Sequence, residues 1–247
     1  MEIYVLMADE TLLYTAGNQA LNTKDGIEYQ MRFTKNYDLI EQYKLLRKEL
    51  YPKDPRFKGF RFFTQIGAED YEDPDHQMLM LYNGNRCYGG ACLRVSTPKR
   101  PTILDLENDI MPGKDKYFFS LKERFPEMEL DKYAYAEFNR IVLHPSLRTG
   151  EATRRIFQAV LDRCVDYRVR YLFGIGDKVR IRLYRQIYTN AGMECKIRDD
   201  VDIPLRQEYE GMKMQLLWGD MKRFHAVESD PQATSLLQPM DDFEITD

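Results

Sequence analysis

The sequence predicts an α/β protein in which helices flank a sheet of mixed direction, and two observations lead to this prediction. Segments with strand character alternate with segments whose apolar residues recur at helical spacing. Their order is helix, β-hairpin, strand, helix, strand, helix and strand. Hairpin strands are antiparallel, whereas a strand, a helix and a strand in succession form a right-handed crossover between parallel strands. Both directions therefore occur in one sheet.

The amino-terminal elements begin with strand character at residues 2–7 and 28–34, and the polar stretch 17–26 between them is predicted to be a loop. A helix follows from residue 37 to about residue 51, because apolar side chains recur at helical spacing until Pro52. The connection after this helix is long, aromatic and charged. Connections of that length usually carry a function or are disordered.

The central elements are a hairpin and a further strand. The apolar runs "QMLMLY" and "RCYGGACLRVS" stand on either side of Asn83-Gly84-Asn85, which is the clearest turn signal in the chain. Met78 and Met80 share one face of the first run, and we expect them to be core residues. The stretch "AYAEFNRIVL", residues 134–143, is the next predicted strand.

The carboxyl-terminal elements alternate between helix and strand. Residues 151–166 place apolar side chains on one helical face, and residues 170–176 form a short apolar run typical of a buried strand. Residues 178–192 are the next helix, which Gly192 closes. Residues 212–219 are the last predicted strand.

Length and composition favour one globular domain with two extensions. The chain has 247 residues, and single hydrophobic cores stop growing at roughly 250 to 300 residues. We assign residues 1–28 to an N-terminal extension, residues 29–225 to the domain and residues 226–247 to a tail. The tail contains six acidic residues, two prolines and no Lys or Arg, a composition typical of disorder.

Composition also excludes several classes of protein. No apolar run approaches the roughly 20 residues that span a bilayer, and the N-terminus lacks the basic region of a signal peptide, so we expect a cytoplasmic protein. Four cysteines and three histidines show no zinc spacing, so we expect free thiols and no metal. His76 and His144 are interpreted as loop or strand-end residues. The acidic chain has no recognised nucleic-acid-reading helix.

Positive charge is nevertheless concentrated in one stretch. Between Arg140 and Arg185, eleven Lys or Arg residues face four Asp or Glu residues. This surplus fits an anionic ligand or partner, although solvated helix faces would give the same count.

One motif combines a buried strand with charged residues at both of its ends. Glu137 and Arg140 stand three apart at the start of the apolar run Ile141–Leu143. A proline, Arg148 and Gly150 follow it and open the next helix. Free backbone amides at a helix N-terminus, with an arginine beside them, suit a phosphate or another anion. The motif therefore predicts a bound anion.

Two segments resemble the GNAT acyltransferase superfamily. The stretch "VLHPSLRTGEA" resembles its strand, proline, arginine and glycine loop, although the glycine lies five residues after the proline where the family usually has six. The stretch "RLYRQIYTNAGM" resembles its late helix. The resemblance implies a GNAT-like fold in which the two central parallel strands splay apart around a phosphopantetheine thioester. That thioester would be a substrate on acyl carrier protein or coenzyme A, with no cofactor tightly bound. The implied donor-binding residues are Ile141, Val142, Leu143, Arg148, Thr149, Gly150, Ala152 and Phe173.

A narrower resemblance, over residues 30–195, is to the autoinducer (acyl-homoserine lactone) synthases and the related N-acyl amino acid synthases. Their Glu-x-x-Arg matches Glu137 and Arg140. Their acidic pair matches Glu69 and Glu72 around Tyr71, with Asp70 and Asp73 as the alternative one residue on, and their strand arginine matches Arg94 unless Cys92 occupies that place. The residues that this resemblance assigns to the acceptor are Arg47, Tyr51, Phe57, Glu69, Glu72 and Arg94.

The same resemblance implies roles in amide formation. Glu137 would orient or deprotonate the acceptor amine, and Arg140 would hold its geometry or a substrate carboxylate. Tyr188 would protonate the leaving thiolate, and Tyr184 lies one turn earlier on the same helix. The alternatives without catalysis are a structural ion pair and a packing tyrosine.

The predicted function is transfer of a fatty acyl group from an acyl carrier protein or coenzyme A thioester to the α-amino group of an amino acid. Phe57 in the place of tryptophan favours a free amino acid over S-adenosylmethionine, which is the acceptor of the lactone synthases. An acetyl-coenzyme A-dependent N-acetyltransferase and a non-catalytic acyl-carrier-binding module are further alternatives. The cations that could dock the acidic surface of an acyl carrier protein are Arg148, Arg154, Arg155, Lys178, Arg180, Arg182 and Arg185.

Overall fold

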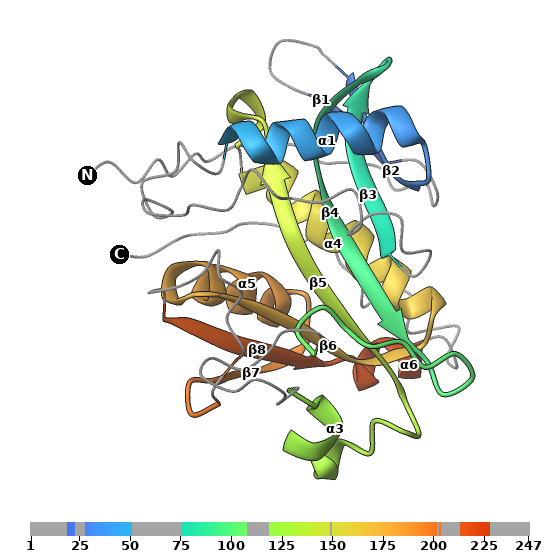
Figure 1. Ribbon diagram of the computed structural model, residues 1–247, viewed down its shortest axis with the longest axis vertical. Coiled ribbons are helices and arrows are strands. Elements are labelled where there is room, and N and C mark those ends of the chain that lie inside the picture. Colours follow the sequence, from blue (N-terminus) through green and yellow to red (C-terminus); the bar gives the residue numbers. More distant parts are fainter. Residues whose placement is uncertain are drawn as a thin grey trace.

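The computed structural model shows a single sheet covered by helices on both faces (Figure 1). It describes residues 19–22, 28–50, 76–107, 119–148, 150–201, 203 and 213–227. Within these residues the sheet has eight strands in the order β1-β2-β3-β4-β5-β6-β8-β7. The β5–β6 pair is parallel and the other pairs are antiparallel. The predicted mixed α/β sheet is therefore confirmed.

The bounds of the elements are as follows. The strands are β1 (Gln19–Asn22), β2 (Glu28–Thr34), β3 (His76–Asn83), β4 (Arg86–Ser96), β5 (Ala134–Leu143), β6 (Val169–Asp177), β7 (Glu194–Arg198) and β8 (Met214–Asp220). The helices are α1 (Tyr37–Leu50), α3 (Leu121–Arg124), α4 (Gly150–Asp166), α5 (Lys178–Asn190) and α6 (Lys222–Val227), with 3-10 turns η3 (Pro126–Met128) and η4 (Pro145–Leu147).

The predicted elements from β2 to β8 are present, with two kinds of correction. Gln19–Asn22, which the sequence placed in a loop, is strand β1 and pairs with β2, so part of the predicted extension 1–28 joins the sheet. β7 and the short helices α3 and α6 were not predicted. These are short polar segments that gain their structure from neighbours distant in sequence, which periodicity does not report. The predicted strand 2–7 lies outside the described residues.

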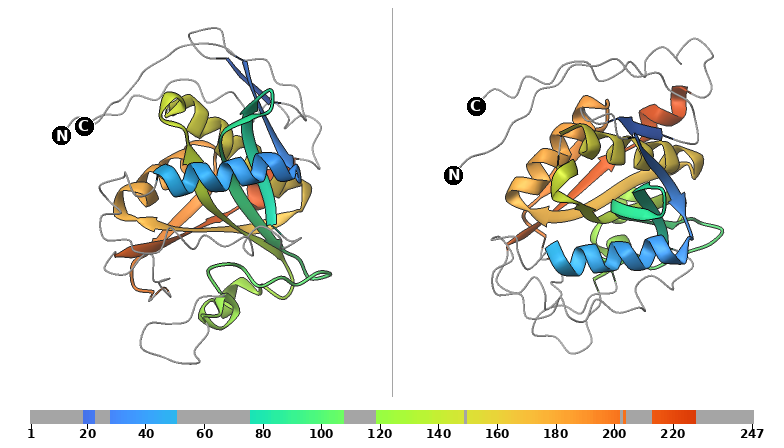
Figure 2. Two further views of the ribbon diagram at one scale, coloured as in Figure 1. Left: turned by 45° about the horizontal axis from the view of Figure 1, so that its top comes forward. Right: turned by 90° about the horizontal axis from the view of Figure 1, so that it is seen from above.

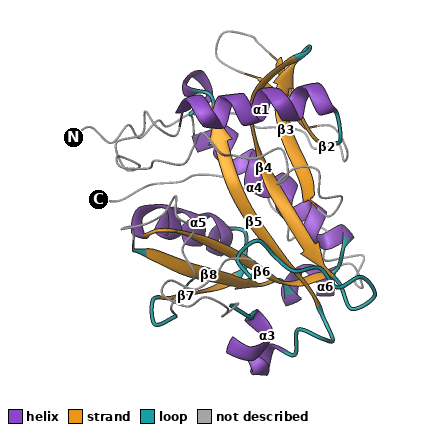
Figure 3. Ribbon diagram, viewed as in Figure 1, coloured by secondary structure: helices purple, strands orange, loops and turns teal. Residues whose placement is uncertain are grey.

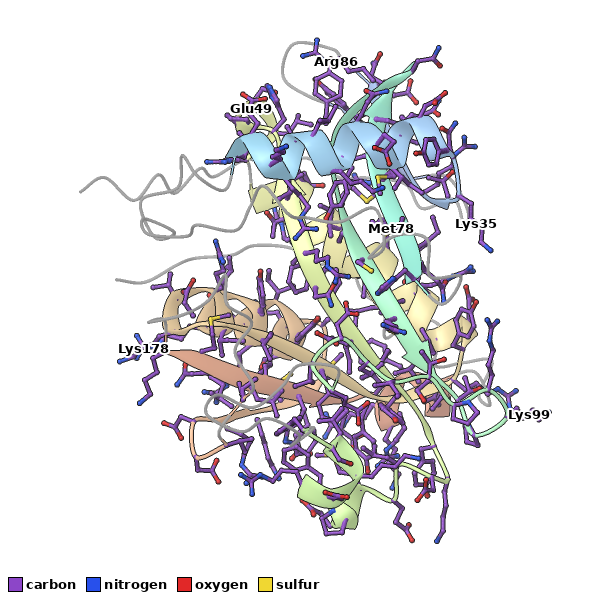
Figure 4. The ribbon with its side chains drawn as sticks, in the orientation of Figure 1. Lys35, Glu49, Met78, Arg86, Lys99 and Lys178 are labelled. Atoms are coloured by element: carbon purple, nitrogen blue, oxygen red, sulfur yellow. The ribbon has the colours of Figure 1, made fainter. Side chains whose placement is uncertain are left out.

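Two helical layers enclose the sheet. α1 buries Leu39, Ile40 and Tyr43 against β3 and β4 together with Met78 and Met80, so the two methionines are core residues as predicted. Figure 4 labels Met78 on this side, near α1. α4 and α5 cover the opposite face, as the right-hand view of Figure 2 shows. They contribute to the largest apolar cluster of the described residues.

A third apolar cluster shares the face on which α1 lies. The segment after β4, with α3 and η3, packs Leu104, Leu106 and Phe125 against Phe173 of β6 and against Tyr135 of β5. Side chains alternate between the two faces of a strand, so Glu137, two residues after Tyr135, projects from the same face. Polar residues therefore lie between the cluster under α1 and the cluster under α3.

The parallel strands β5 and β6 separate halfway along their length. They pair from Ala134 and Val169 as far as Glu137 and Phe173, and no pairing continues beyond this point. Both strands nevertheless extend further, to Leu143 and to Asp177, and they diverge in Figure 3. The second half of β5 therefore presents a sheet edge toward the space beside β6.

A β-bulge lies in this free half of β5. Gly90 pairs with Val142 and Cys92 with Asn139, so Arg140 and Ile141 together stand opposite one residue of β4. β4 needs glycine here, because a Cβ on Gly90 would lie 2.3 Å from a backbone oxygen of β3. The bulge changes the direction in which the strand presents its side chains and amides.

Candidate active site

The polar residues of the central strands form one row across the sheet. His76 of β3 pairs in register with Arg94 of β4, and Arg94 pairs with Glu137 of β5. All three side chains are buried, with exposed fractions of 6%, 8% and 1%. Buried charges are costly unless they are paired or hydrogen-bonded, so the row needs partners from above the sheet.

Asp105, from the segment after β4, supplies these partners. Its Oδ1 accepts a hydrogen bond from Arg94 Nη1 at 2.9 Å and lies 3.0 Å from His76 Nε2. Its Oδ2 forms a salt bridge with Arg140 Nη1 at 2.6 Å and accepts from Asn139 Nδ2 at 2.8 Å. One buried carboxylate therefore joins residues of three strands.

Glu137 stands beside this network with neutral hydrogen-bond partners. Its Oε2 accepts from the backbone N–H of Leu106 at 2.9 Å, and its Oε1 accepts from Asn139 Nδ2 at 3.1 Å. Burial, and after it the negative charge of Asp105, raise the pKa of Glu137 to about 7, against the opposing effects of the two hydrogen bonds and of Arg140. A carboxyl group with this pKa can accept or release a proton near neutral pH.

The bulge places Arg140 in an unusual backbone conformation. Its φ is +58°, in the left-handed region that residues other than glycine rarely adopt. The hydroxyl of Tyr43, a fully buried residue of α1, donates to the carbonyl of Arg140. The side chain of Arg140 reaches Asp105 and passes 3.9 Å from the sulfur of Cys92. Helix α1 thus helps to hold the bulge in place.

The turn that carries Asp105 is itself anchored by a buried carboxylate. Glu107 accepts from the backbone N–H of Leu104 at 3.1 Å and from that of Leu121, the first residue of α3, at 3.1 Å. The turn therefore delivers the side chain of Asp105 and the amide of Leu106 to the sheet as one unit.

The predicted catalytic pair is brought into the site, whereas Tyr188 lies on the other side of the sheet. Glu137 and Arg140 belong to one buried network, but their side chains bind Asp105 and Asn139 and form no direct ion pair with each other in the described residues. Tyr188 is buried in the main core, with its ring 5.1 Å from that of Phe157. Burial raises the pKa of its hydroxyl well above the usual value, so it stays protonated.

The predicted donor residues flank the free half of β5. Ile141 is half-buried, whereas Val142 and Leu143 are buried, and the Arg148 Nε donates to the carbonyl of Leu143 at 3.4 Å. Gly150 is the first residue of α4 and is exposed. Ala152 packs in the main core, Phe173 packs under α3, and Thr149 lies outside the described residues.

Two of the predicted acceptor residues can be placed. Arg47 is buried on α1, with its guanidinium carbon 5.9 Å from the centre of the Tyr43 ring. Arg94 belongs to the Asp105 network, which supports its assignment over Cys92. The other predicted residues lie outside the described part of the chain, namely Tyr51, Phe57, Glu69, Asp70, Glu72 and Asp73.

Sequence reasoning missed Asp105 and Asn139 and gave His76 too little weight. His76 is indeed at a strand end, but it is buried within the site and its Nδ1 has no hydrogen-bond partner among the described residues. The signal for Asp105 was one acidic residue between two leucines in a segment without periodicity. Its partners lie 11 to 35 residues away, so only folding brings them together.

Thiol chemistry is a poor fit to this site. Cys92 is the cysteine that touches the network, and burial raises its pKa to about 12, so it is a neutral thiol at physiological pH. The four cysteines are free.

Among the described residues, no three His, Cys, Asp or Glu side chains are arranged to hold a metal ion. No helix in the described part of the chain is long and apolar enough to cross a membrane.

Comparison with known proteins identifies the fold. No family model and no curated sequence matches the chain. Among solved structures, an insect putative arylalkylamine N-acetyltransferase from the yellow fever mosquito matches with a TM-score of 0.52 and 11% identity, over 82% of this chain and 92% of that chain. This similarity, with the splayed parallel strands, shows the GNAT acyltransferase fold.

Structures of the two narrower families are also matched. FeeM, an N-acyl amino acid synthase from uncultured soil microbes, has a TM-score of 0.49 and 14% identity, over 83% of this chain and 97% of that chain. BjaI, a coenzyme A-dependent acyl-homoserine lactone synthase solved with S-adenosylmethionine and isopentyl-coenzyme A, has a TM-score of 0.47 and 17% identity, over 82% of this chain and 81% of that chain. At these values the matches do not decide between donors or acceptors.

Proposed function

We propose that this protein is an amide-forming N-acyltransferase that moves an acyl group from a thioester to an amine, with Glu137 as the proton acceptor. The observation that carries the proposal is the position of Glu137. It is the last residue of β5 that pairs with β6, so a buried carboxyl with a pKa of about 7 lies where the two strands separate. Beyond this point the free half of β5 can pair with an extended donor arm.

The chemistry requires an unprotonated amine and a fixed thioester carbonyl. Ionised Glu137 takes one proton from the acceptor ammonium, directly or through a water molecule. The amine nitrogen then attacks the thioester carbon, the carbon–sulfur bond breaks, and the second nitrogen proton goes to the leaving thiolate. Amides of the free half of β5 would stabilise the oxyanion that forms in between. We retain Tyr188 as the proposed group that passes this proton to sulfur: its protonated hydroxyl gives a proton to the thiolate and regains one from the nitrogen. Because Tyr188 lies on the opposite face of the sheet from Glu137, this role requires the sulfur to lie between the separated strands β5 and β6.

The proposed donor is a fatty acyl group carried on acyl carrier protein. α5 exposes Val179 and Leu183 one turn apart, with exposed fractions of 69% and 43%. Lys178, Arg182 and Arg185 lie around them and form no salt bridge within the described chain, and Figure 4 shows Lys178 at the outer end of the helix. A basic surface with an apolar centre complements an acidic carrier protein. The coenzyme A thioester is the alternative donor.

The proposed acceptor is a free amino acid, as the sequence predicted, with S-adenosylmethionine as the alternative. A carboxylate on the acceptor would need a cation. Arg47, on the neighbouring helix, is the described cation that we assign to that carboxylate. We expect the reaction to take place in the cytoplasm, where both donors occur.

The proposal is tested by supplying donors and acceptors to the purified protein. Hexanoyl to palmitoyl thioesters on acyl carrier protein and on coenzyme A are incubated with a mixture of amino acids, and the products are read by mass spectrometry. We expect N-acyl amino acids and stoichiometric thiol release. Glu137→Gln should lower kcat by at least about 100-fold, which is typical for loss of a general base, while donor binding persists.

A control variant and the product masses separate the alternatives. Glu127→Gln, which changes an exposed carboxylate outside the network, should leave turnover unchanged. Formation of acyl-homoserine lactones from S-adenosylmethionine would show that S-adenosylmethionine, and not an amino acid, is the acceptor. Turnover of acetyl-coenzyme A alone would show that the donor is acetyl-coenzyme A and not a fatty acyl thioester. If no donor is consumed and acyl carrier protein binds equally to the wild type and to Glu137→Gln, the protein is a binding module and the proposal is wrong.

A further inference from the structure

Asp105 binds the guanidinium groups of Arg94 and Arg140, and Glu137 binds neither. Asp105 accepts from Arg94 at 2.9 Å and pairs with Arg140 at 2.6 Å. Glu137 accepts its hydrogen bonds from an amide N–H and an Asn side chain and forms no salt bridge within the described chain. The two carboxylates share Asn139, whose Nδ2 lies 2.8 Å from Asp105 and 3.1 Å from Glu137.

This division matters because the two carboxyl groups compete for the same cations. Arg94 is the register partner of Glu137 on the adjacent strand, and Arg140 follows it by three residues. An arginine beside a carboxylate lowers its pKa, typically by 1 to 3 units, and occupies the lone pairs that a base needs. With both guanidinium groups bound to Asp105, burial and the charge of Asp105 outweigh the lowering effects of Arg140 and of the two hydrogen bonds on the pKa of Glu137.

We propose that Asp105 is a positioning residue of the acyltransferase site, which holds Arg94 and Arg140 away from Glu137 and so leaves Glu137 free to accept the proton of the acceptor amine. This inference rests on the proposed function and adds a residue that acts through another. Asp105 and Leu106 are consecutive residues of the turn that Glu107 anchors. This one turn therefore holds the two arginines through the Asp105 carboxylate and holds Glu137 through the Leu106 amide.

Among the described residues, the charged and titratable groups that contact this pair come from three strands. His76 approaches from β3, Arg94 and Cys92 from β4, and Arg140 from β5. Arg94 and Arg140 are the permanently charged groups in this set. Removing the negative charge of Asp105 takes a shared anion away from both arginines, and ionised Glu137 is the neighbouring buried carboxylate within the described chain toward which they can turn.

The test compares Asp105→Asn with the wild type in two measurements. The first is the dependence of kcat/KM on pH, whose acid limb reports the ionisation of the base in the free enzyme. We expect this limb near pH 7 in the wild type, and we expect it to move down by one pH unit or more in Asp105→Asn, with a lower plateau. Asp105→Glu keeps the charge and should restore a limb close to that of the wild type.

The matched control is Glu107→Gln, which changes another buried carboxylate of the same turn. Glu107 holds two backbone amides, so this variant should lower the melting temperature and leave the acid limb in place. If Asp105→Asn behaves like Glu107→Gln, with lower stability or rate and an unmoved limb, then Asp105 has a structural role only and the inference is overturned.

The second measurement needs no substrate. The carboxyl carbon of Glu137 is titrated by carbon-13 NMR in the wild type and in Asp105→Asn, with Glu137→Gln to assign the signal. A fall of the pKa of Glu137 in Asp105→Asn supports the inference, and an unchanged or higher pKa overturns it. Absence of acyl transfer by the wild type would refute the proposed function and leave this titration as a separate result.

A second variant serves if Asp105→Asn does not fold. Arg94→Gln removes one of the two cations that bind Asp105, so that the negative charge of Asp105 is less neutralised and acts more strongly on Glu137. The pKa of Glu137 should then rise above that of the wild type. An unchanged pKa in Arg94→Gln would contradict the proposed role of Asp105.

Discussion

Arg140 combines two requirements that one amino acid rarely meets. Its side chain forms the salt bridge with Asp105, which favours arginine, while its φ of +58° favours glycine. A residue kept in such a conformation commonly lies at a functional site, where the surrounding contacts hold it in place. Here those contacts are the Asp105 carboxylate on one side and the Tyr43 hydroxyl on the other.

Two substitutions at Arg140 separate these requirements. Arg140→Ala and Arg140→Gly both remove the salt bridge, but glycine accepts the left-handed backbone without strain. We expect Arg140→Gly to be more stable than Arg140→Ala by about 1 kcal/mol, as judged from the cost of that conformation for an L-residue. Urea unfolding of the two variants measures the difference. Equal stability, or a more stable alanine variant, would show that the bulge carries no such strain.

Different elements cover the two faces of the sheet. α1 and the turn 104–107 lie on the face of the Glu137 network, whereas α4 and α5 lie on the other, where α5 has four Lys or Arg residues and no acidic residue. Between these layers, the pairing of β5 with β6 stops at Glu137 and Phe173. An acyl donor docked at α5 could therefore reach the network from the open side of β5.

Charge reversal on α5 tests this arrangement at the level of one helix. Lys178→Glu with Arg182→Glu should raise KM for acyl carrier protein thioesters at least ten-fold and leave KM for a short acyl-pantetheine unchanged, because the small donor makes no contact with the helix. Lys35→Glu with Lys48→Glu, two exposed positions away from α5, is the charge-matched control. Equal losses with both donors would indicate damage to the site and would remove α5 as the docking surface.

At the scale of the whole molecule, burial of Glu137 links stability to pH. Its pKa in the folded protein, about 7, lies above the ordinary value of 4.5. The folded state therefore binds this proton more tightly than the unfolded state does. The resulting stabilisation is fully present below pH 4.5 and is lost as pH rises through about 7.

Glu137→Gln removes this dependence, because glutamine has a similar shape and stays neutral. We expect the melting temperature of the variant, relative to that of the wild type, to rise between pH 5 and about pH 7 and to level off at higher pH. Differential scanning calorimetry at matched ionic strength measures the change, and Glu127→Gln should run parallel to the wild type. A gap between Glu137→Gln and the wild type that stays constant with pH would contradict the raised pKa.

The sequence by itself determined the fold class and one half of the site. Periodicity and turn signals predicted the longer elements from residue 28 onward, because apolar patterning along one element is a local property. The Glu-x-x-Arg motif placed Glu137 and Arg140 on one strand, and both lie in the buried network. Polar strands such as β1 and β7 gave no local signal, because sheet pairing with distant residues stabilises them.

The tertiary structure alone decided what surrounds Glu137. Asp105 lies 32 positions before Glu137, in a segment without periodicity. The turn that Glu107 anchors places the Asp105 carboxylate against the sheet. Whether a Glu and an Arg three residues apart pair with each other or with a third residue depends on backbone direction. The bulge at Arg140 turns its guanidinium toward Asp105. Within the described chain, Arg140 therefore pairs with Asp105 and not with Glu137, its neighbour in the sequence motif.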